Sequence, residues 1–294
     1  MARGHSLHLG LNAVDPAHYE GWNGVLGGCE NDARDMAAIA QMQGYTSTKV
    51  LLTAEATAGA FIGHMIDLAR QLESGDILFL SYSGHGGQVP DLDDDEEQDG
   101  LDETWCLYDR MLIDDELFRL FARFASGVRI FMLSDSCHSG SVARELMQSR
   151  GMSFEELPRA ARAAAEVLAP QGASLAGFDR IRLAPPDTTL AAYMKHESLY
   201  RSLQAAASGA ERGPVGAGVI LISGCQDNEV SYDGAVNGLF TQTLKHVWNG
   251  GAFAGDYGAF QRRIKQYLVG RQTPNFFRVG RVTTAFRRQK PFTI

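Results

Sequence analysis

Short apolar runs alternate along the chain with longer stretches in which apolar residues recur every three to four positions. The first pattern predicts β-strands and the second predicts amphipathic helices. We expect strands at His5–Ala13, Thr48–Leu52, Asp76–Tyr82, Val128–Ser134, Gly218–Ser223 and Asn275–Val279. We expect helices at Asn31–Gln43, Thr57–Leu72, Asp114–Ala125, Leu239–Trp248 and Asp256–Val269. This alternation favours an α/β domain with a mainly parallel six-stranded sheet flanked by helices.

Two of the expected strands, Asp76–Tyr82 and Val128–Ser134, are almost continuously apolar. Such runs are typical of strands that are covered on both faces. Thr57 and Asp114 are the predicted N-caps of the helices that they begin. A hairpin formed by Thr104–Leu107 and Met111–Ile113 is expected beyond the main sheet.

Residues 142–216 interrupt the alternation. They are rich in Ala, Arg and Glu, with helical patterns over Glu155–Leu168 and Thr188–Ala207 and no strand pattern. Because roughly seventy residues are too many for an ordinary connection between strands, we interpret this segment as a helical insertion after the fourth strand. The chain as a whole, residues 1–294, is predicted to be one domain.

Composition and charge exclude several classes of protein. The 294 residues are 45% hydrophobic and 21% charged, as in ordinary globular domains. The net charge of −8 comes from residues 91–103, which hold nine acids, while the remainder has 26 acids and 27 bases. We therefore expect no nucleic-acid partner. No apolar run is long enough to span a membrane, no leader peptide is expected, and four cysteines without a paired spacing indicate a reducing, cytoplasmic compartment.

Candidate chemistry lies directly after two of the expected strands. His85 follows the third strand in Tyr82-Ser83-Gly84-His85-Gly86-Gly87, and Cys137 follows the fourth in Asp135-Ser136-Cys137-His138-Ser139-Gly140. Catalytic groups of parallel sheets gather at the carboxyl ends of the strands. If these two strands are neighbours, the histidine can serve as the base that activates the thiol.

A single cysteine or histidine can also have a purely structural role. Cysteines are often small buried apolar side chains, and Cys29, Cys106 and Cys225 fit that description. His138 is a weaker candidate for the base, since adjacent residues after a strand rarely face one another. The pair His85 and Cys137, each in a Gly/Ser loop after a strand, favours the catalytic interpretation.

These motifs, about fifty residues apart and in this order, resemble those of the caspase–haemoglobinase clan of cysteine peptidases. Within the clan they resemble the type I metacaspases and their bacterial relatives, the orthocaspases. Supporting segments are Gly28–Ala33, Asp99–Glu103 and Ile222–Asp227. The resemblance implies a caspase-haemoglobinase fold and cleavage of peptide bonds after arginine or lysine.

The resemblance also implies roles for individual residues. His85 would act as general base and acid, Cys137 as nucleophile, and the backbone N–H groups of Gly86 and Cys137 as oxyanion hole. The pocket for the basic side chain would be lined by Cys29, Asp32, Ser83 and Asp135. Two carboxylates suit a guanidinium. Without the resemblance, Asp32 reads equally well as a helix N-terminal acid and Asp135 as a loop cap.

The acid-rich residues 91–103 allow three interpretations. They are a solvated run of charges, a patch that attracts basic peptides, or a cation site. Their spacing excludes an EF-hand. The resemblance implies calcium ligands at three aspartates, here called the acidic triplet: Asp102, Asp114 and Asp115. Arg144 stands where the family's fourth aspartate is expected. We therefore expect that no cofactor is required and that Ca²⁺ dependence is weak or absent.

The sequence and its resemblance thus predict a metacaspase-like cysteine endopeptidase, and two alternatives remain. One is a catalytically silent caspase-like protein that binds basic peptides, and the other is a metal-dependent hydrolase built on the acidic stretch. The expected partners are protein or peptide substrates with basic residues at the cut site, and the expected state is a monomer. Because bases are scattered through 142–216, the segment is either cut by the enzyme itself or a stable helical subdomain.

Overall fold

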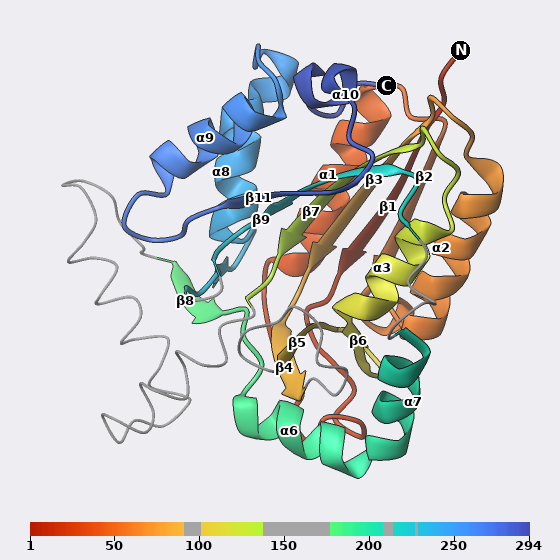
Figure 1. Ribbon diagram of the computed structural model, residues 1–294. Helices are drawn as coiled ribbons and strands as arrows, with labels where there is room; N and C mark the ends of the chain where they lie inside the picture. Colours follow the sequence, from red (N-terminus) through yellow and green to blue (C-terminus); the bar gives the residue numbers. More distant parts are fainter. Residues whose placement is uncertain (91–100, 138–176, 208–213, 227–228) are drawn as a thin grey trace.

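A six-stranded sheet forms the centre of the protein. The computed structural model describes residues 1–90, 101–137, 177–207, 214–226 and 229–294 (Figure 1). The sheet has the order β11-β9-β7-β3-β1-β2, and only β11 runs antiparallel to its neighbour. Its strands are β1 Gly4–Gly10, β2 Ser47–Leu52, β3 Ile77–Ser83, β7 Arg129–Asp135, β9 Gly218–Ser223 and β11 Asn275–Gly280. All six strands were expected from the apolar pattern, and the mainly parallel sheet is confirmed.

The first strand is shorter than the predicted His5–Ala13. It ends at Gly10, and the next residue, Leu11, donates its N–H to the carbonyl of Ser83 at 3.0 Å. A Cβ atom at Gly10 would lie 2.3 Å from the carbonyl oxygen of Cys29. The strand therefore gives way to a loop where helix α1 crosses close to its end.

Helices cover both faces of the sheet, as the continuous apolar runs predict. One face packs against α1 Cys29–Met42, α8 Leu239–Trp248, α9 Tyr257–Tyr267 and α10 Thr284–Arg288, and the other against α2 Ala58–Gln71 and α3 Asp114–Ala122. Side chains of β3 alternate between the two cores: Phe79 belongs to the first and Leu80 to the second. The predicted double coverage is confirmed.

The two predicted N-caps have different outcomes. Thr57 caps α2, since its hydroxyl accepts a hydrogen bond from the N–H of Ala60 at 3.1 Å. Asp114 is not a cap: Ile113 occupies that position, and Glu116 accepts from its N–H at 3.4 Å. Asp114 instead starts the first helical turn, where the dipole of the helix favours acidic side chains.

The expected hairpin is part of a three-stranded antiparallel sheet. It contains β5 Leu101–Cys106 and β6 Met111–Ile113, and β4 Gly86–Pro90 pairs with β5. Strand β4 was not predicted because it begins with two glycines, which have low strand propensity. Its first residue follows His85 directly, so this small sheet is joined to the candidate site.

The described part of the 142–216 segment corrects one prediction. It contains strand β8 Phe178–Ile181, which pairs antiparallel with β10 Tyr232–Gly234, although no strand was expected there. Two of the four β8 residues, Asp179 and Arg180, are exposed, which hides the apolar signal. The expected helix Thr188–Ala207 is two helices, α6 Pro186–Lys195 and α7 Glu197–Ala207. The helix predicted at Glu155–Leu168 lies outside the described residues.

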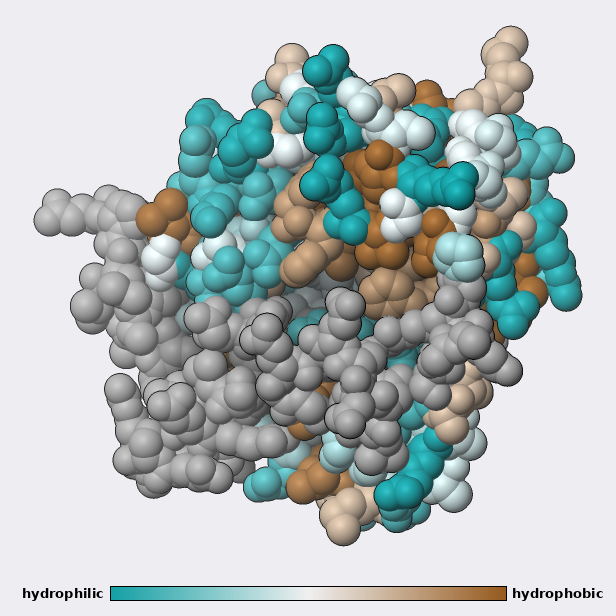
Figure 2. All heavy atoms as spheres, in the orientation of Figure 1, coloured by the Kyte–Doolittle hydropathy of each residue, from teal (hydrophilic) through white to brown (hydrophobic). Residues whose placement is uncertain are grey.

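Two 3₁₀ turns complete the described elements, η1 Thr53–Glu55 and η4 Asn249–Gly251. On the side seen in Figure 2, hydrophilic side chains lie above and on either side of an apolar area in the upper half of the view. None of the helices in the described ranges combines the length and apolar character needed to cross a bilayer.

Candidate active site

His85 and Cys137 emerge at the same edge of the main sheet. Strands β3 and β7 are direct neighbours, and their last paired residues are Ser83 and Asp135. Each candidate residue stands two positions beyond the end of its strand. The expectation that the two strands are adjacent is confirmed, and the carboxyl ends of both strands point to this edge.

The imidazole of His85 is buried, with 5% of its surface exposed. Its Nε2 lies 2.9 Å from the carbonyl oxygen of Gly24. Because a carbonyl only accepts, Nε2 carries the hydrogen of the neutral ring and Nδ1 keeps its lone pair. Nδ1 is buried and has no hydrogen-bond partner among the described residues. Burial lowers the pKa of His85 to about 4, so the ring is neutral at pH 7 and available as a base.

The backbone at Cys137 is arranged around a carbonyl oxygen of the same chain. The N–H groups of Gly86 and Cys137 donate to the Arg182 carbonyl at 3.0 and 3.2 Å. Two converging backbone donors of this kind stabilise the oxyanion that develops during acyl transfer. The thiol of Cys137 is fully buried beside the backbone of Ser231, with Sγ 3.6 Å from its carbonyl oxygen and also in contact with its N–H.

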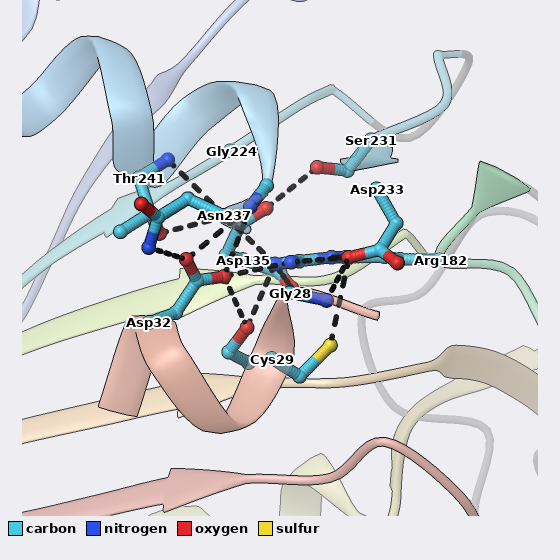
Figure 3. A network of polar contacts seen from close by, with 12 residues as sticks. Gly28, Cys29, Asp32, Asp135, Arg182, Gly224, Ser231, Asp233, Asn237 and Thr241 are labelled. Atoms are coloured by element: carbon cyan, nitrogen blue, oxygen red, sulfur yellow. Dashed lines mark hydrogen bonds and ion pairs between the residues drawn. The ribbon is translucent and has the colours of Figure 1, made fainter. Parts of the chain in front are cut away.

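The side chain of Arg182 enters a closed pocket of three carboxylates (Figure 3). Its guanidinium is fully buried, and it lies 2.7 Å from Asp32 and 2.8 Å from both Asp135 and Asp233. It also donates to the hydroxyl of Ser83 at 2.7 Å. We call the three acids Asp32, Asp135 and Asp233 the arginine pocket. Burial opposes the charge of Arg182, but these carboxylates raise its pKa well above the ordinary value.

Further polar groups hold the acids of this pocket in place. Asp32 accepts from the amide of Asn237 at 2.8 Å, and Asp135 accepts from the hydroxyls of Thr241 at 2.8 Å and Ser231 at 2.6 Å. Burial raises the pKa of Asp32 to about 6, the charge of Asp135 adds to this shift, and Arg182 opposes it. The pocket is therefore fixed in shape before any ligand is considered.

The residues around the arginine pocket leave space for a guanidinium. A Cβ atom at Gly238 would lie 2.5 Å from the Arg182 Cζ, so only glycine leaves room for this side chain. On another side Cys29 is fully buried with Sγ 3.9 Å from Asp233 Oδ1, and burial raises the pKa of its thiol. All four residues expected to line the pocket, Cys29, Asp32, Ser83 and Asp135, lie around the Arg182 side chain or its carboxylate partners.

The residues of the site that the sequence analysis did not assign include Arg182, Ser231 and Asp233. Asp233 lies in a short polar stretch that belongs to no motif, and its strand β10 has only three residues. Arg182 is one of many bases in its segment, and nothing local distinguishes it. The contacts join residues 51 and 150 positions apart along the chain, which no periodicity records.

The acidic triplet is organised differently. Asp102 lies on β5, whereas Asp114 and Asp115 begin α3. One carboxylate oxygen of Asp102 accepts from the amide of Gln204 at 2.6 Å. Within the part of the chain that the structure describes, no cluster of three or more His, Cys, Asp or Glu residues is placed to hold a metal ion. Arg144, on which the calcium expectation depends, lies outside the described residues.

Comparison with known proteins shows which family has this architecture. The caspase domain family (Peptidase_C14) matches residues 13–286. The chain belongs to the caspase family. Metacaspase-1A from Aspergillus fumigatus is 33% identical over 260 residues, which cover 81% of this chain and 58% of that protein. Metacaspase-1 from Emericella nidulans is 32% identical, with 81% and 60% covered, so the chain spans little more than half the length of these relatives.

Solved structures agree with the family assignment. Protein GSU0716 from Geobacter sulfurreducens is 43% identical, with a TM-score of 0.82 over 99% of this chain and 98% of that one. Caspase-1 from Spodoptera frugiperda is 11% identical, with a TM-score of 0.50 over 94% of this chain and 86% of that one, which bears on the fold alone. The caspase-like α/β fold and the metacaspase resemblance expected from the motifs are both confirmed.

Proposed function

We propose that this caspase-family protein is a cysteine endopeptidase that cleaves peptide bonds on the carboxyl side of arginine. One observation carries the proposal: the side chain of Arg182 fills the arginine pocket while its carbonyl oxygen accepts from the N–H groups of Gly86 and Cys137. An arginine peptide bound in the same way presents its scissile carbonyl to the thiol.

The chemistry follows from the groups around that carbonyl. Nδ1 of His85 takes the thiol proton, and the thiolate of Cys137 attacks the carbonyl carbon to form a tetrahedral intermediate. The two backbone N–H groups stabilise its oxyanion. His85 then gives the proton to the leaving amine, and a thioester remains on Cys137. Water, deprotonated by His85, releases the acid product and restores the thiol.

We propose that arginine is preferred over lysine and that aspartate is excluded. Three nitrogen atoms of the Arg182 guanidinium reach different acceptors in the pocket, and its planar fork suits paired carboxylates. A lysine ammonium offers one nitrogen and reaches fewer of them. An aspartate side chain there adds a fourth negative charge to a buried acidic site, which is strongly unfavourable.

The test uses fluorogenic peptides that differ only in having Arg, Lys or Asp before the cut. We expect cleavage to fall in that order, with no measurable cleavage after Asp. Cys137→Ala and His85→Ala should each remove turnover while the fold survives. Gly238→Ala is a matched variant without change of charge, and it should weaken arginine cleavage because its methyl group takes the space of the guanidinium.

Two results would contradict the proposal. Faster cleavage after Asp than after Arg would overturn the assignment of the pocket. Binding of arginine peptides without any turnover by the folded protein would favour a catalytically silent, basic-peptide-binding protein instead.

The setting of the enzyme is part of the same proposal. We propose a monomeric enzyme in a reducing, cytoplasmic compartment, acting on protein or peptide substrates with basic residues and needing no cofactor. All four cysteines are free and buried, and the mechanism requires a reduced Cys137. Size-exclusion chromatography with light scattering tests the monomer, and turnover with and without a thiol reductant tests the redox requirement.

A further inference from the structure

The indole of Trp22 lies against the imidazole of His85. The centroids of the two rings are 4.7 Å apart, and the ring planes are inclined by 60°. Edge-to-face contacts at this separation are a favourable arrangement of aromatic rings. The proposed mechanism uses His85 but gives Trp22 no part, so the contact calls for an account of what the indole does.

The loop between β1 and α1 carries Trp22 to this place through an unusual backbone. Glu20 has a φ of 54°, and the glycines Gly21 and Gly24 have φ angles of 87° and 53°. Left-handed backbone is rare outside glycine. Three such residues within five positions turn the chain tightly on both sides of Trp22 and bring its side chain back over the site.

Further contacts fix this loop to the body of the protein. Tyr19 is fully buried, and its hydroxyl donates to the Leu107 carbonyl at 2.7 Å. The backbone N–H of Trp22 donates to the carbonyl of Tyr19 at 2.9 Å, and that of Val14 donates to the carbonyl of Asn23 at 3.0 Å. The position of the indole is therefore set by the fold on both sides of it.

Both rings pack against the backbone of Gly24. A Cβ atom at Gly24 would lie 2.8 Å from Cη2 of Trp22 and 3.0 Å from Cδ2 of His85. The Gly24 carbonyl accepts from Nε2 of His85 at 2.9 Å. Because Cδ2 and Nδ1 stand on opposite edges of an imidazole, Nδ1 lies on the edge that faces away from Gly24.

The hydrogen bond to Gly24 does not by itself hold the ring at one angle. The backbone of His85 is fixed, since its carbonyl accepts from the Tyr82 hydroxyl at 2.6 Å and from the Cys106 N–H at 2.9 Å. The remaining freedom is rotation about the Cβ–Cγ bond, which is broad and roughly two-fold for histidine. A half-turn would exchange Nδ1 with Cδ2 and remove the lone pair from the side where the base is needed.

We infer that Trp22 is a positioning residue of the peptidase: its indole holds the imidazole of His85 at the angle that keeps Nδ1 free to take the thiol proton of Cys137. The inference rests on the proposed function and adds to it a residue that touches neither the nucleophile nor the arginine pocket.

The indole also covers the ring. Burial is the main reason why the pKa of His85 is lowered to about 4, while the charge of Asp233 raises it and that of Arg182 lowers it. Loss of the indole admits water, so the pKa should rise toward the ordinary value of histidine. The ring stays mostly neutral at pH 7 even so. A loss of activity at pH 7 would therefore report the orientation of the base and not its protonation.

The first experiment measures kcat and KM for an arginine peptide at pH 7. Trp22→Ala should lower kcat by about tenfold to a hundredfold, because a misplaced base costs rate, and change KM less than about threefold. Trp22→Phe keeps an aromatic ring and should restore kcat to within about threefold of the wild type.

Glu20→Gln is the matched control in the same loop. It removes the ion pair with Lys195, at 2.6 Å, without touching either ring, and should cleave like the wild type. Thermal unfolding checks the fold of each variant. If Trp22→Ala does not fold, Gly24→Ala replaces it: the added methyl group meets both rings and should lower kcat while the indole is still present.

The second experiment observes His85 without any turnover. Two-bond ¹⁵N spectra of protein with labelled histidine report the tautomer of each ring, and loss of one signal set in His85→Ala identifies His85. The wild type should carry its hydrogen on Nε2. Trp22→Ala should show both tautomers and a pKa of His85 raised by about one unit.

The outcomes are distinct. A Trp22→Ala protein with unchanged kcat and unchanged His85 spectrum would overturn the inference, and so would a raised KM with unchanged kcat, which would make the indole a wall of the substrate site. If Trp22→Ala changes the spectrum but the wild type cleaves no arginine peptide, the proposed function fails while the contact between the two rings is upheld.

Discussion

Two groups of aspartates in this protein make different contacts. In the arginine pocket, Asp32, Asp135 and Asp233 converge on one guanidinium at 2.7 to 2.8 Å. In the acidic triplet, Asp102 receives the neutral amide of Gln204, and the other two acids begin a helix. Both groups contain three acids, so the count of carboxylates does not distinguish them. Their partners do.

The difference shows what a set of buried acids needs in order to bind a cation specifically. Several carboxylates held together are costly unless a positive charge lies among them. The arginine pocket has that charge and a second ring of donors from Asn237 and Thr241. Asp102 accepts from the neutral amide of Gln204, and the start of α3 favours acids through its backbone dipole. We therefore expect changes in the first group to alter activity and changes in the second to alter stability.

The largest expected effect is that of Asp135→Asn. Removing one charge from a buried pair costs about 2–5 kcal/mol, which corresponds to roughly thirtyfold to several thousandfold in kcat/KM for arginine peptides. Asp114→Asn, in the acidic triplet, is the matched control and should change kcat/KM less than about threefold, as surface and helix-end changes usually do. Thermal unfolding checks that both variants fold. Equal losses of activity in the two variants would erase the distinction between the two groups.

Next in size is the effect of Gln204→Ala on stability. The buried amide of Gln204 donates to Asp102 at 2.6 Å and to the Pro90 carbonyl at 2.7 Å. Its loss removes two buried hydrogen bonds and should lower the free energy of unfolding by about 1–3 kcal/mol. Urea denaturation measures this, with the exposed Ser202→Ala on the same helix as a near-neutral control. An unchanged midpoint for Gln204→Ala would show that Asp102 has another donor that suffices.

The pH dependence of arginine cleavage should come next. Asp32 must be ionised to hold the guanidinium, and burial raises its pKa to about 6 while Arg182 is bound. Since Arg182 is among the groups that lower this pKa, the emptied pocket takes up a proton at a higher pH still. Because kcat/KM reports the ionisation of the free enzyme, we expect it to fall already as the pH drops through values above 6, by up to about tenfold per pH unit.

Asp32→Asn provides the comparison for that profile. Its residual activity should lack the acid limb assigned to Asp32. A limb at the same pH in wild type and variant would assign the titration to another group.

The smallest expected effect is that of calcium. Ca²⁺ takes six to eight oxygen ligands, and a carboxylate already bonded to an amide is a poor starting point for such a site. Activity on arginine peptides in chelator should therefore change less than about tenfold, or 1.4 kcal/mol, when calcium is added across the micromolar to millimolar range. A hundredfold rise would show that the acidic triplet is a functional cation site and that the two groups are more alike than their partners suggest.

Much of the fold was predictable because it rests on local patterns. The runs Asp76–Tyr82 and Val128–Ser134 are apolar on both sides of each strand, and both strands are central in the sheet. Strand β8 was not predictable, because its short polar sequence becomes a strand only through pairing with β10. Propensity and periodicity act within a few residues, whereas this pairing joins segments about fifty residues apart.

The residues of the site also differ in whether local sequence or long-range contacts define their roles. His85 and Cys137 stand in recognisable loops after strands, and Asp32 and Asp135 were placed through the resemblance to metacaspases. Asp233 and Arg182 were not found, since their roles arise from contacts over long stretches of chain. A base in the sequence shows that cleavage is chemically allowed. Only the fold shows which base lies on the N–H groups of the nucleophile loop.

A cut within residues 142–216, one of the two alternatives for that segment, would change how the protein unfolds. Strand β7 precedes the segment and β9 follows it, yet the two strands pair in parallel from Arg129 and Gly218 to Ser134 and Ser223 at the centre of one sheet. The cut molecule is therefore a complex of two polypeptides that share one hydrophobic core. Its assembly becomes bimolecular, and its melting temperature rises with protein concentration, whereas the uncut chain melts at a concentration-independent temperature. Dilution would therefore lower the melting temperature of the cut protein and leave that of the uncut chain unchanged.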